Sequence, residues 1–306
     1  MLDVITISAI LIVAGVMWRI IKPQGLDADQ LRHSLTGIVY NLLLPALVVG
    51  VLWSAELGLT SFVIVLMAAT GVIVGLALAW FWLKIFPQSN RATGALLLAA
   101  AFPNATYLGL PVLESVLGES ARAIAIQYDL LSCTPILLSG GVLIAIHFGQ
   151  SKDHNPQIIK NLLRVPPLWA AIVGLLLNMT DIVEPQILQQ LFEMLGNGVV
   201  PLMLFSIGLS LRWRAGWSQQ LNQILPVVVI QLILTPLIIY WLIPFFSIDT
   251  MTEMALVLEA AMPSMVLGIV LADRYRLDSH LYAMAVTVTT VLSMITLPIW
   301  YSVLGG

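Results

Sequence analysis

Long apolar stretches constrain this chain more than any motif does. Nearly the whole sequence divides into apolar runs of about 18 to 26 residues, and a helix of that length crosses a ~30 Å hydrocarbon core. Of the 306 residues, 59% are hydrophobic and only 9% are charged, whereas soluble domains carry roughly 25% charged residues. A surface that faces water on all sides is therefore excluded. The sequence predicts an all-α membrane protein.

The apolar runs predict ten transmembrane helices. Helices are expected because backbone polar groups must be paired within lipid, and the runs are longer than the strands of a barrel. The first run lacks a basic start and a small-residue cleavage site, so it is interpreted as a membrane helix and not as a signal peptide. The expected spans are 2–21, 34–54, 59–84, 92–118, 122–148, 165–179, 187–211, 222–245, 253–272 and 279–304.

The basic residues predict the orientation of these helices. Twelve of the thirteen Lys and Arg residues fall at helix ends that would face one side of the membrane, and Arg122 is the exception. The side rich in Lys and Arg is cytoplasmic by the positive-inside rule. Both termini are therefore predicted on the outer, periplasmic side of the cell inner (plasma) membrane.

Two proline-containing elements recur in the two halves of the sequence. The segment from Asn41 to Pro45 matches the segment from Asn197 to Pro201 at an offset of 156 residues. Ala-Ala-Phe-Pro-Asn, ending at Asn104, matches Ala-Ala-Met-Pro-Ser, ending at Ser264, at an offset of 160 residues. Because five helices is an odd number, the second copy must be inverted in the membrane. Inverted repeats with interrupted helices are typical of secondary transporters.

This repeat divides the chain into two five-helix halves. The first half is predicted at residues 1–149, a cytoplasmic linker at 150–164, and the second, inverted half at 165–306. Pro103 and Pro263 fall about ten residues into the fourth and ninth helices, where each removes a backbone hydrogen bond. We expect both helices to be broken there and to cross, with half-helix N-termini facing the membrane centre.

The residues around the first break resemble a known family. The segment Ala-Phe-Pro-Asn-Ala-Thr-Tyr-Leu-Gly-Leu-Pro, residues 101–111, resembles the signature of the auxin efflux carrier family, and 41–45 and 261–272 fit the same family. The resemblance implies a ten-helix fold shared with the bile-acid/sodium symporters. It also implies a scaffold domain from helices 1, 2, 6 and 7, a transport domain from helices 3–5 and 8–10, and small organic anions as substrates, either mono- or dicarboxylates.

The resemblance and the break positions together give the candidate site. The substrate is expected to contact the helix 4 break around Asn104 and Thr106, with Asn41 and Asn197 facing it from the scaffold. The complete set of substrate candidates is Asn41, Pro103, Asn104, Thr106, Asn197, Pro263 and Ser264. No catalytic residue is expected.

Two acidic residues inside the apolar spans are candidates for ion coupling, since ionisable groups at such depth are functional by default. Glu259 precedes Pro263 by one turn, and Glu-Ala-Ala-Met resembles the segment that supplies a sodium ligand in the bile-acid symporters. Glu259, Asp129 and Asn104 could hold a sodium ion, the one possible metal, or a proton could take its place. Structural alternatives are a protonated, hydrogen-bonded Glu259 and an Asp129 that caps exposed backbone.

Other polar residues and other functions were weighed against this interpretation. Glu114 is expected to be solvated near the outer surface, and Gln231 to form an interhelical hydrogen bond. An uncoupled carrier or a channel is the main alternative. An intramembrane enzyme is less favoured, because the expected protease motifs are absent. No organic cofactor and no nucleic-acid partner are expected; lipid is the surrounding partner, and a homodimer is one open possibility.

Overall fold

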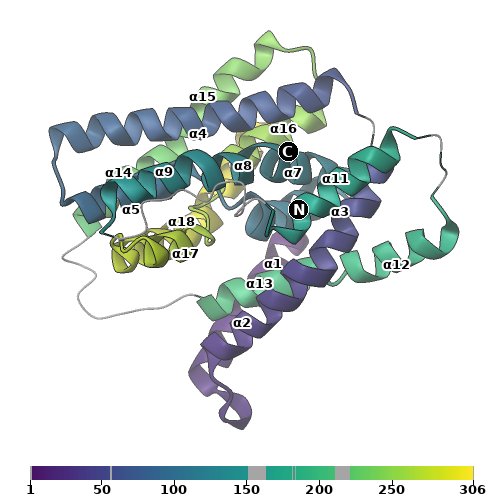
Figure 1. Cartoon of the computed structure of the whole chain (residues 1–306), viewed down its shortest axis with the longest axis horizontal. Helices are drawn as coiled ribbons and strands as arrows, with labels where there is room; N and C mark the ends of the chain where they lie inside the picture. Colours follow the sequence, from purple (N-terminus) through teal and green to yellow (C-terminus); the bar gives the residue numbers. More distant parts are fainter. Residues whose placement is uncertain are drawn as a thin grey trace. The chain divides into compact units, whose positions relative to one another are not determined.

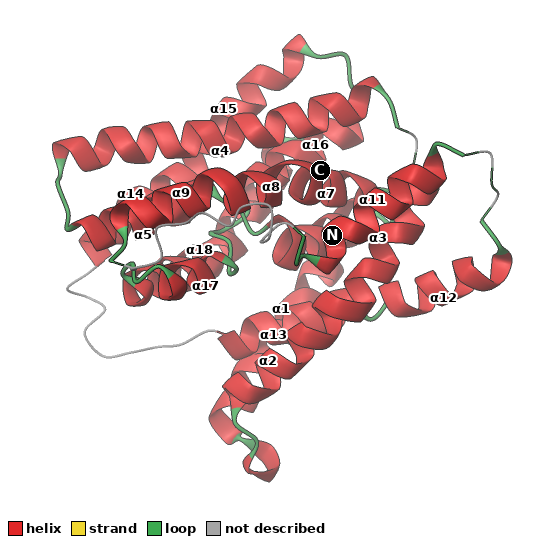
Figure 2. Cartoon of the chain, in the orientation of Figure 1, coloured by secondary structure: helices red, strands yellow, loops and turns green. Residues whose placement is uncertain are grey.

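The computed structural model describes residues 2–55, 57–150, 163–180, 182, 184–210 and 221–305, with side chains at all of these except 2–9, 24 and 210. Within these ranges the chain is helical, and the only strand-type pairing is an isolated antiparallel bridge between Pro103 and Ser264. Figure 2 shows helices joined by short loops. The predicted linker at 150–164 lies almost wholly outside the described residues.

The helices follow the expected spans closely. They are α1 (Leu2–Ile21), α2 (Ala28–Ile38), α3 (Leu44–Trp53), α4 (Leu59–Ile85), α5 (Asn90–Ala101), α6 (Leu110–Leu117), α7 (Ala121–Tyr128), α8 (Thr134–Ile136), α9 (Val142–Phe148), α11 (Pro166–Asn178), α12 (Gln186–Gly196), α13 (Val199–Ser210), α14 (Leu221–Val229), α15 (Thr235–Leu242), α16 (Thr250–Ala260), α17 (Gly268–Arg274) and α18 (Ser279–Val303) (Figure 1).

Six helices in the described part of the chain are long and apolar enough to cross a membrane. They are Ala28–Trp53, Leu59–Ile85, Ala121–Phe148, Gln186–Leu209, Leu221–Phe245 and Ser279–Val303. Shorter apolar helices at Ile10–Ile21, Ala105–Leu117 and Pro166–Asn178 lie within other expected spans. The chain is therefore an all-helical, multi-pass membrane protein. The count of ten crossings and the inverted repeat stay predictions.

Several helices are continuous but locally widened before a proline. Four π-helical turns each end two residues before a proline, because proline has no N–H to donate to the carbonyl four residues earlier. These turns are Val39–Leu43, Ala105–Gly109, Asp129–Cys133 and Ile230–Leu234, which precede Pro45, Pro111, Pro135 and Pro236. Between α2 and α3, therefore, the Asn41–Pro45 element widens a continuous helix and does not break it.

The chain forms two compact units. Unit 1 comprises Met1–Gly58, Thr106–Ile126 and Ile159–Arg212. In it α1 packs against α13, and α3 packs against α11 and α12. Gly15 and Gly208 allow the close approach of α1 and α13, because a Cβ on Gly208 would lie 2.0 Å from the Ile12 carbonyl oxygen.

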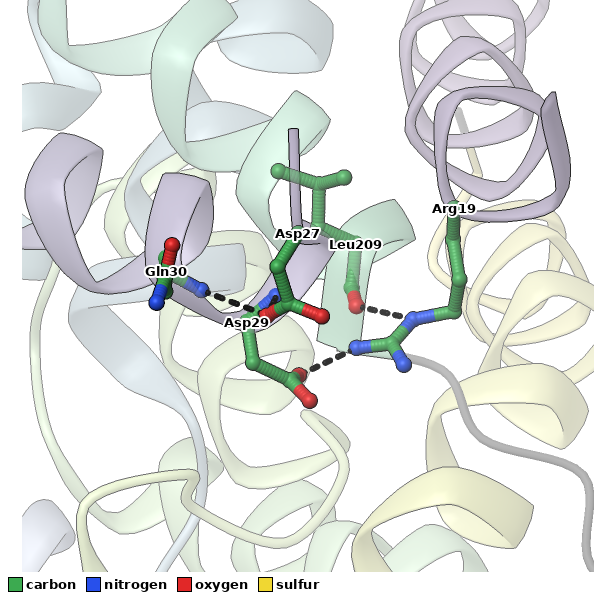
Figure 3. Close-up of polar contacts among 5 residues, drawn as sticks. All are labelled: Arg19, Asp27, Asp29, Gln30 and Leu209. Carbon is green, nitrogen blue, oxygen red and sulfur yellow. Dashed lines mark hydrogen bonds and ion pairs between the residues drawn. The ribbon is translucent and has the colours of Figure 1, made fainter. Parts of the chain in front are cut away.

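Arg19 joins three helices at one end of unit 1 (Figure 3). Its Nε donates to the Leu209 carbonyl in α13 at 2.7 Å, and its Nη2 donates to Asp29 in α2 at 2.5 Å. Asp27 caps α2 by accepting the backbone N–H groups of Asp29 and Gln30. This end belongs to the side predicted to be cytoplasmic.

Unit 2 comprises Leu59–Ala105, Gln127–Ile158 and Trp213–Gly306. The long helix α4 packs against α5 and α15, and α18 packs against α5, α14, α16 and α17; α4 and α15 lie side by side in Figure 1. Gly75 permits the contact between α4 and α5, because a Cβ there would lie 2.7 Å from the Ala100 carbonyl oxygen. This packing encloses the two helix breaks within unit 2.

Candidate functional site at two crossing helix breaks

The predicted breaks at Pro103 and Pro263 are confirmed, and they are bonded to each other. Helix α5 ends at Ala101 and α16 ends at Ala260. The Asn104 N–H donates to the Pro263 carbonyl at 2.7 Å, and the Met265 N–H donates to the Phe102 carbonyl at 2.8 Å. The two unwound segments thus form a short antiparallel bridge. They satisfy backbone groups that helix termination leaves open.

Ser264 completes the backbone pairing of the break at Pro103, at the end of α5. Pro103 has no N–H, so the Ala99 carbonyl four residues earlier loses its helical partner. The Ser264 hydroxyl donates to that carbonyl at 2.6 Å, and the Ser264 N–H donates to the Thr289 hydroxyl at 3.2 Å. Ser264 is 0% exposed. Its polar side chain is used inside the protein, so its predicted contact with substrate stays a prediction.

Asn104 occupies the matching position of the other break and is bonded differently. Its side chain is 1% exposed, and neither the oxygen nor the nitrogen of its amide has a hydrogen-bond partner. Buried amides are nearly always paired, and an exception in a native site points to a missing water, ion or ligand. Asn104 therefore offers one acceptor and two donors to a bound group.

Glu259 lies in the last turn of α16, before the break at Pro263. It is 0% exposed, and both of its carboxylate oxygens lack a hydrogen-bond partner. Asp129 is also buried, accepts a hydrogen bond from the Thr134 hydroxyl at 2.9 Å, and lies near enough for its charge to act on Glu259. A carboxylate at such a place needs a cation or a proton.

Gln231 reaches the same break from the π-helical turn Ile230–Leu234, between α14 and α15. Its Nε2 donates to the Met262 carbonyl at 2.9 Å, which confirms the expected interhelical hydrogen bond. Its Oε1 is buried without a partner. The sequence alone did not connect Gln231 with the break after α16, because the two bonded residues are 31 positions apart.

The remaining candidates belong to unit 1. Asn41 is exposed and donates to the Gly37 carbonyl at 2.8 Å, Thr106 is buried, and the Asn197 side chain accepts from Arg122. Pro103, Asn104, Pro263 and Ser264 come together in unit 2, whereas Asn41, Thr106 and Asn197 are grouped elsewhere. Their predicted approach to the crossing stays a prediction.

A matched pair of helix caps was missed in the sequence. Ser89 caps α5 by accepting the Ala92 N–H, and Asp249 caps α16 by accepting the Thr252 N–H. Ser89 and Asp249 are 160 positions apart, the same offset that separates the two prolines. Both are preferred N-cap residue types, so the match was visible in the sequence.

Comparison with known proteins decides the family. A family model described as membrane transport protein matches residues 3–301. The chain belongs to this membrane transport family. The match covers nearly the whole chain and confirms the resemblance to auxin efflux carriers that residues 101–111 suggested.

Similar transporters occur in archaea and bacteria. The chain is 29% identical to an uncharacterized transporter of Methanothermobacter thermautotrophicus over 98% of this chain and 97% of the relative. It is 26% identical to an uncharacterized transporter of Methanocaldococcus jannaschii, with the same two coverages. An uncharacterized transporter of Escherichia coli is 23% identical over 75% of this chain and 74% of the relative.

The buried polar side chains at the crossing therefore belong to a membrane transport protein. Among the residues that the structure describes, no group of three or more His, Cys, Asp and Glu side chains gathers as a metal site. Asn104 and Gln231 each hold an unpaired amide oxygen.

Proposed function

We propose that this membrane transport protein is a secondary transporter that moves a small organic anion by alternating access. The transported anion is a mono- or dicarboxylate of the auxin, malate or malonate kind. Ten helices form two inverted halves, and the termini lie on the outer side of the plasma membrane. The matched caps and matched prolines at one offset support the repeat.

One observation supports the binding site above all others: the amide of Asn104 is buried and entirely unpaired at the bonded crossing of two broken helices. The Asn104 Nδ2 group would donate to the substrate carboxylate. The half-helix that begins after the break would add the partial positive charge of its N-terminus.

Cation coupling through Glu259 follows from charge balance. The crossing presents two buried acidic side chains, Glu259 and Asp129, so an anion there needs added positive charge. A sodium ion or a proton held by Glu259 would supply it and make anion affinity depend on cation concentration. Sodium is favoured by the neutral oxygens of Asn104 and Gln231.

The test is uptake of radiolabelled malonate, malate and indole-3-acetate into proteoliposomes under imposed sodium or proton gradients. A carrier saturates and shows counterflow, whereas a channel does neither. The Glu259→Gln variant should lose the gradient dependence, and Asp129→Asn tests the second carboxylate. Uptake that ignores both gradients in the wild type would refute coupling and leave an uncoupled carrier. A retained dependence in Glu259→Gln would move the ion site elsewhere.

A further inference from the structure

Of the Lys and Arg residues, Arg122 alone falls on the side that the predicted membrane orientation makes the outer one. Its side chain is buried. Its guanidinium, 8% exposed, forms a two-pronged ion pair with Glu114: Nε lies 2.8 Å from one carboxylate oxygen and Nη2 lies 2.5 Å from the other. Glu114 was expected to be solvated, but its side chain is only 19% exposed. The fork geometry of Arg fits one carboxylate in this way. The pair closes the turn between α6 and α7.

The same guanidinium also reaches the junction between α12 and α13. Arg122 Nη2 donates to the Asn197 side-chain oxygen at 3.2 Å. Asn197 lies at the interruption between α12 and α13, whereas Glu119, at 3.5 Å, is 78% exposed and peripheral. The Glu114 pair alone would fix the local turn. The bond to Asn197 is what joins that turn to the α12–α13 junction.

Residues 106–126, the outer segment, are grouped with helices that the predicted domain division calls the scaffold. Within unit 1, α6 packs against α1 and α13. Both ends of the outer segment adjoin irregular backbone: the break at 102–104 precedes it, and the π-helical turn Asp129–Cys133 follows it. Irregular backbone of this kind permits a helix to change direction, so the movement proposed below would begin at these two places.

The matching segment of the second half is held in another way. At an offset of 160 positions in the sequence, residues 266–286 correspond to the outer segment, and they belong to unit 2. Tyr282, which matches Arg122, donates to the Met265 carbonyl at 2.8 Å and so binds the break of its own half. In the first half, the Arg122 side chain bonds to a residue outside α6 and α7. In the second half, the Tyr282 hydroxyl bonds to Met265, just before α17.

We propose that Arg122 is an outer latch: its bond to Asn197 holds the outer segment against the α12–α13 junction and closes the outer side, and this bond breaks when that side opens. The proposal rests on the alternating access proposed above. Glu114 stays with Arg122 throughout, so the charge remains neutralised when the latch is released.

The test measures outer access directly and needs no substrate. In a Cys133→Ser background, which removes the one native cysteine, the fully buried Leu113 of α6 is replaced by cysteine. Its reaction with a membrane-impermeant maleimide is followed in proteoliposomes. Ser115→Cys is a second, nearly isosteric reporter if Leu113→Cys does not fold.

Two variants of the exposed Asn197 should act in opposite directions. Asn197→Ala removes the latch bond alone and should raise the labelling rate roughly tenfold, and Asn197→Asp adds a charge partner for Arg122 and should lower it. Glu119→Gln is the matched control and should label like the reference. Equal labelling of Asn197→Ala, Asn197→Asp and the reference would overturn the latch, even if transport persists. If the wild-type protein transports none of the tested anions but the variants show the expected labelling pattern, the proposed function is refuted and the latch is not.

Discussion

The two breaks at the crossing match in position and differ in how their side chains are used. Ser264, after Pro263, donates to the carbonyl that Pro103 leaves unpaired. Asn104, after Pro103, gives the opposite break only its backbone N–H and keeps its amide free. One break residue therefore completes the structure, and the other is available to a ligand. Matching positions at the two breaks therefore need not share a role.

The largest expected effect comes from Asn104→Ala. A hydrogen bond to a charged group contributes about 1.5–3 kcal/mol, so anion affinity should fall roughly 10- to 100-fold. Stability should not fall, because the amide has no partner to lose. Binding is measured by scintillation proximity with labelled malonate, and stability by thermal unfolding.

Asn178→Ala is the control for that experiment. The Asn178 amide is paired with the carbonyls of Trp53 and Ala55, at 2.9 and 2.7 Å. Its removal should lower stability and leave affinity unchanged. An Asn104→Ala protein that binds normally, or that unfolds as easily as Asn178→Ala, would contradict the division of roles.

Ser264→Ala should show the reverse pattern. It leaves the buried Ala99 carbonyl without a donor, which costs about 1–3 kcal/mol of folding free energy, while anion affinity should persist. Unfolding in a graded detergent series measures the loss. Ser293→Ala is the matched control, since Ser293 is buried but donates only to a carbonyl three residues earlier in its own helix. Equal losses in both variants would argue against a special role for Ser264.

Trp300→Phe extends the comparison to another proline. Pro236 leaves the Leu232 carbonyl unpaired, and the Trp300 indole N–H donates to it at 2.9 Å. Loss of that bond should cost about 1 kcal/mol. In a Pro236→Ala background residue 236 has its own N–H, so the cost of Trp300→Phe should shrink. A cost that is the same in both backgrounds would show that the indole contributes packing alone.

The smallest effect concerns the caps of the two broken helices. The Thr252 hydroxyl, followed by backbone N–H groups, lowers the pKa of Asp249 from its ordinary value of 3.8. A lowered pKa in the folded state gives stability that is present above pH 3.8 and lost as the pH falls through the folded pKa. Ser89 does not titrate there. Hydrogen exchange should therefore show fraying at the start of α16 at low pH with no matching change in α5, and equal fraying of both would refute the explanation.

Much of the fold could be predicted because its signals are local. Apolar length located the helices, and Pro103 and Pro263 located the breaks, since a proline in mid-helix removes a backbone hydrogen bond. The rule is not general, because the helices stay continuous at Pro45 and Pro236. The caps Ser89 and Asp249 were equally local and could have been found by applying the same offset.

The assignment of partners could not be predicted in this way. Ser264 bonds to a carbonyl 165 positions away, and Arg122 to a side chain 75 positions away. The sequence around Glu114 contains no feature that distinguishes a solvated carboxylate from one paired with an arginine. Whether a buried polar group is free or used depends on such distant contacts, and for Asn104 and Ser264 that distinction decides the role.

The bridge between the two breaks has a consequence for how such a protein can change over evolution. Both of its bonds join main-chain atoms, Asn104 N to Pro263 O and Met265 N to Phe102 O, and main-chain bonds place no demand on which side chain is attached. At the proposed site, replacements at residue 104 would therefore alter the chemistry offered to a transported molecule without disturbing these two main-chain bonds. A lineage built on this joint would then acquire new substrates by single substitutions.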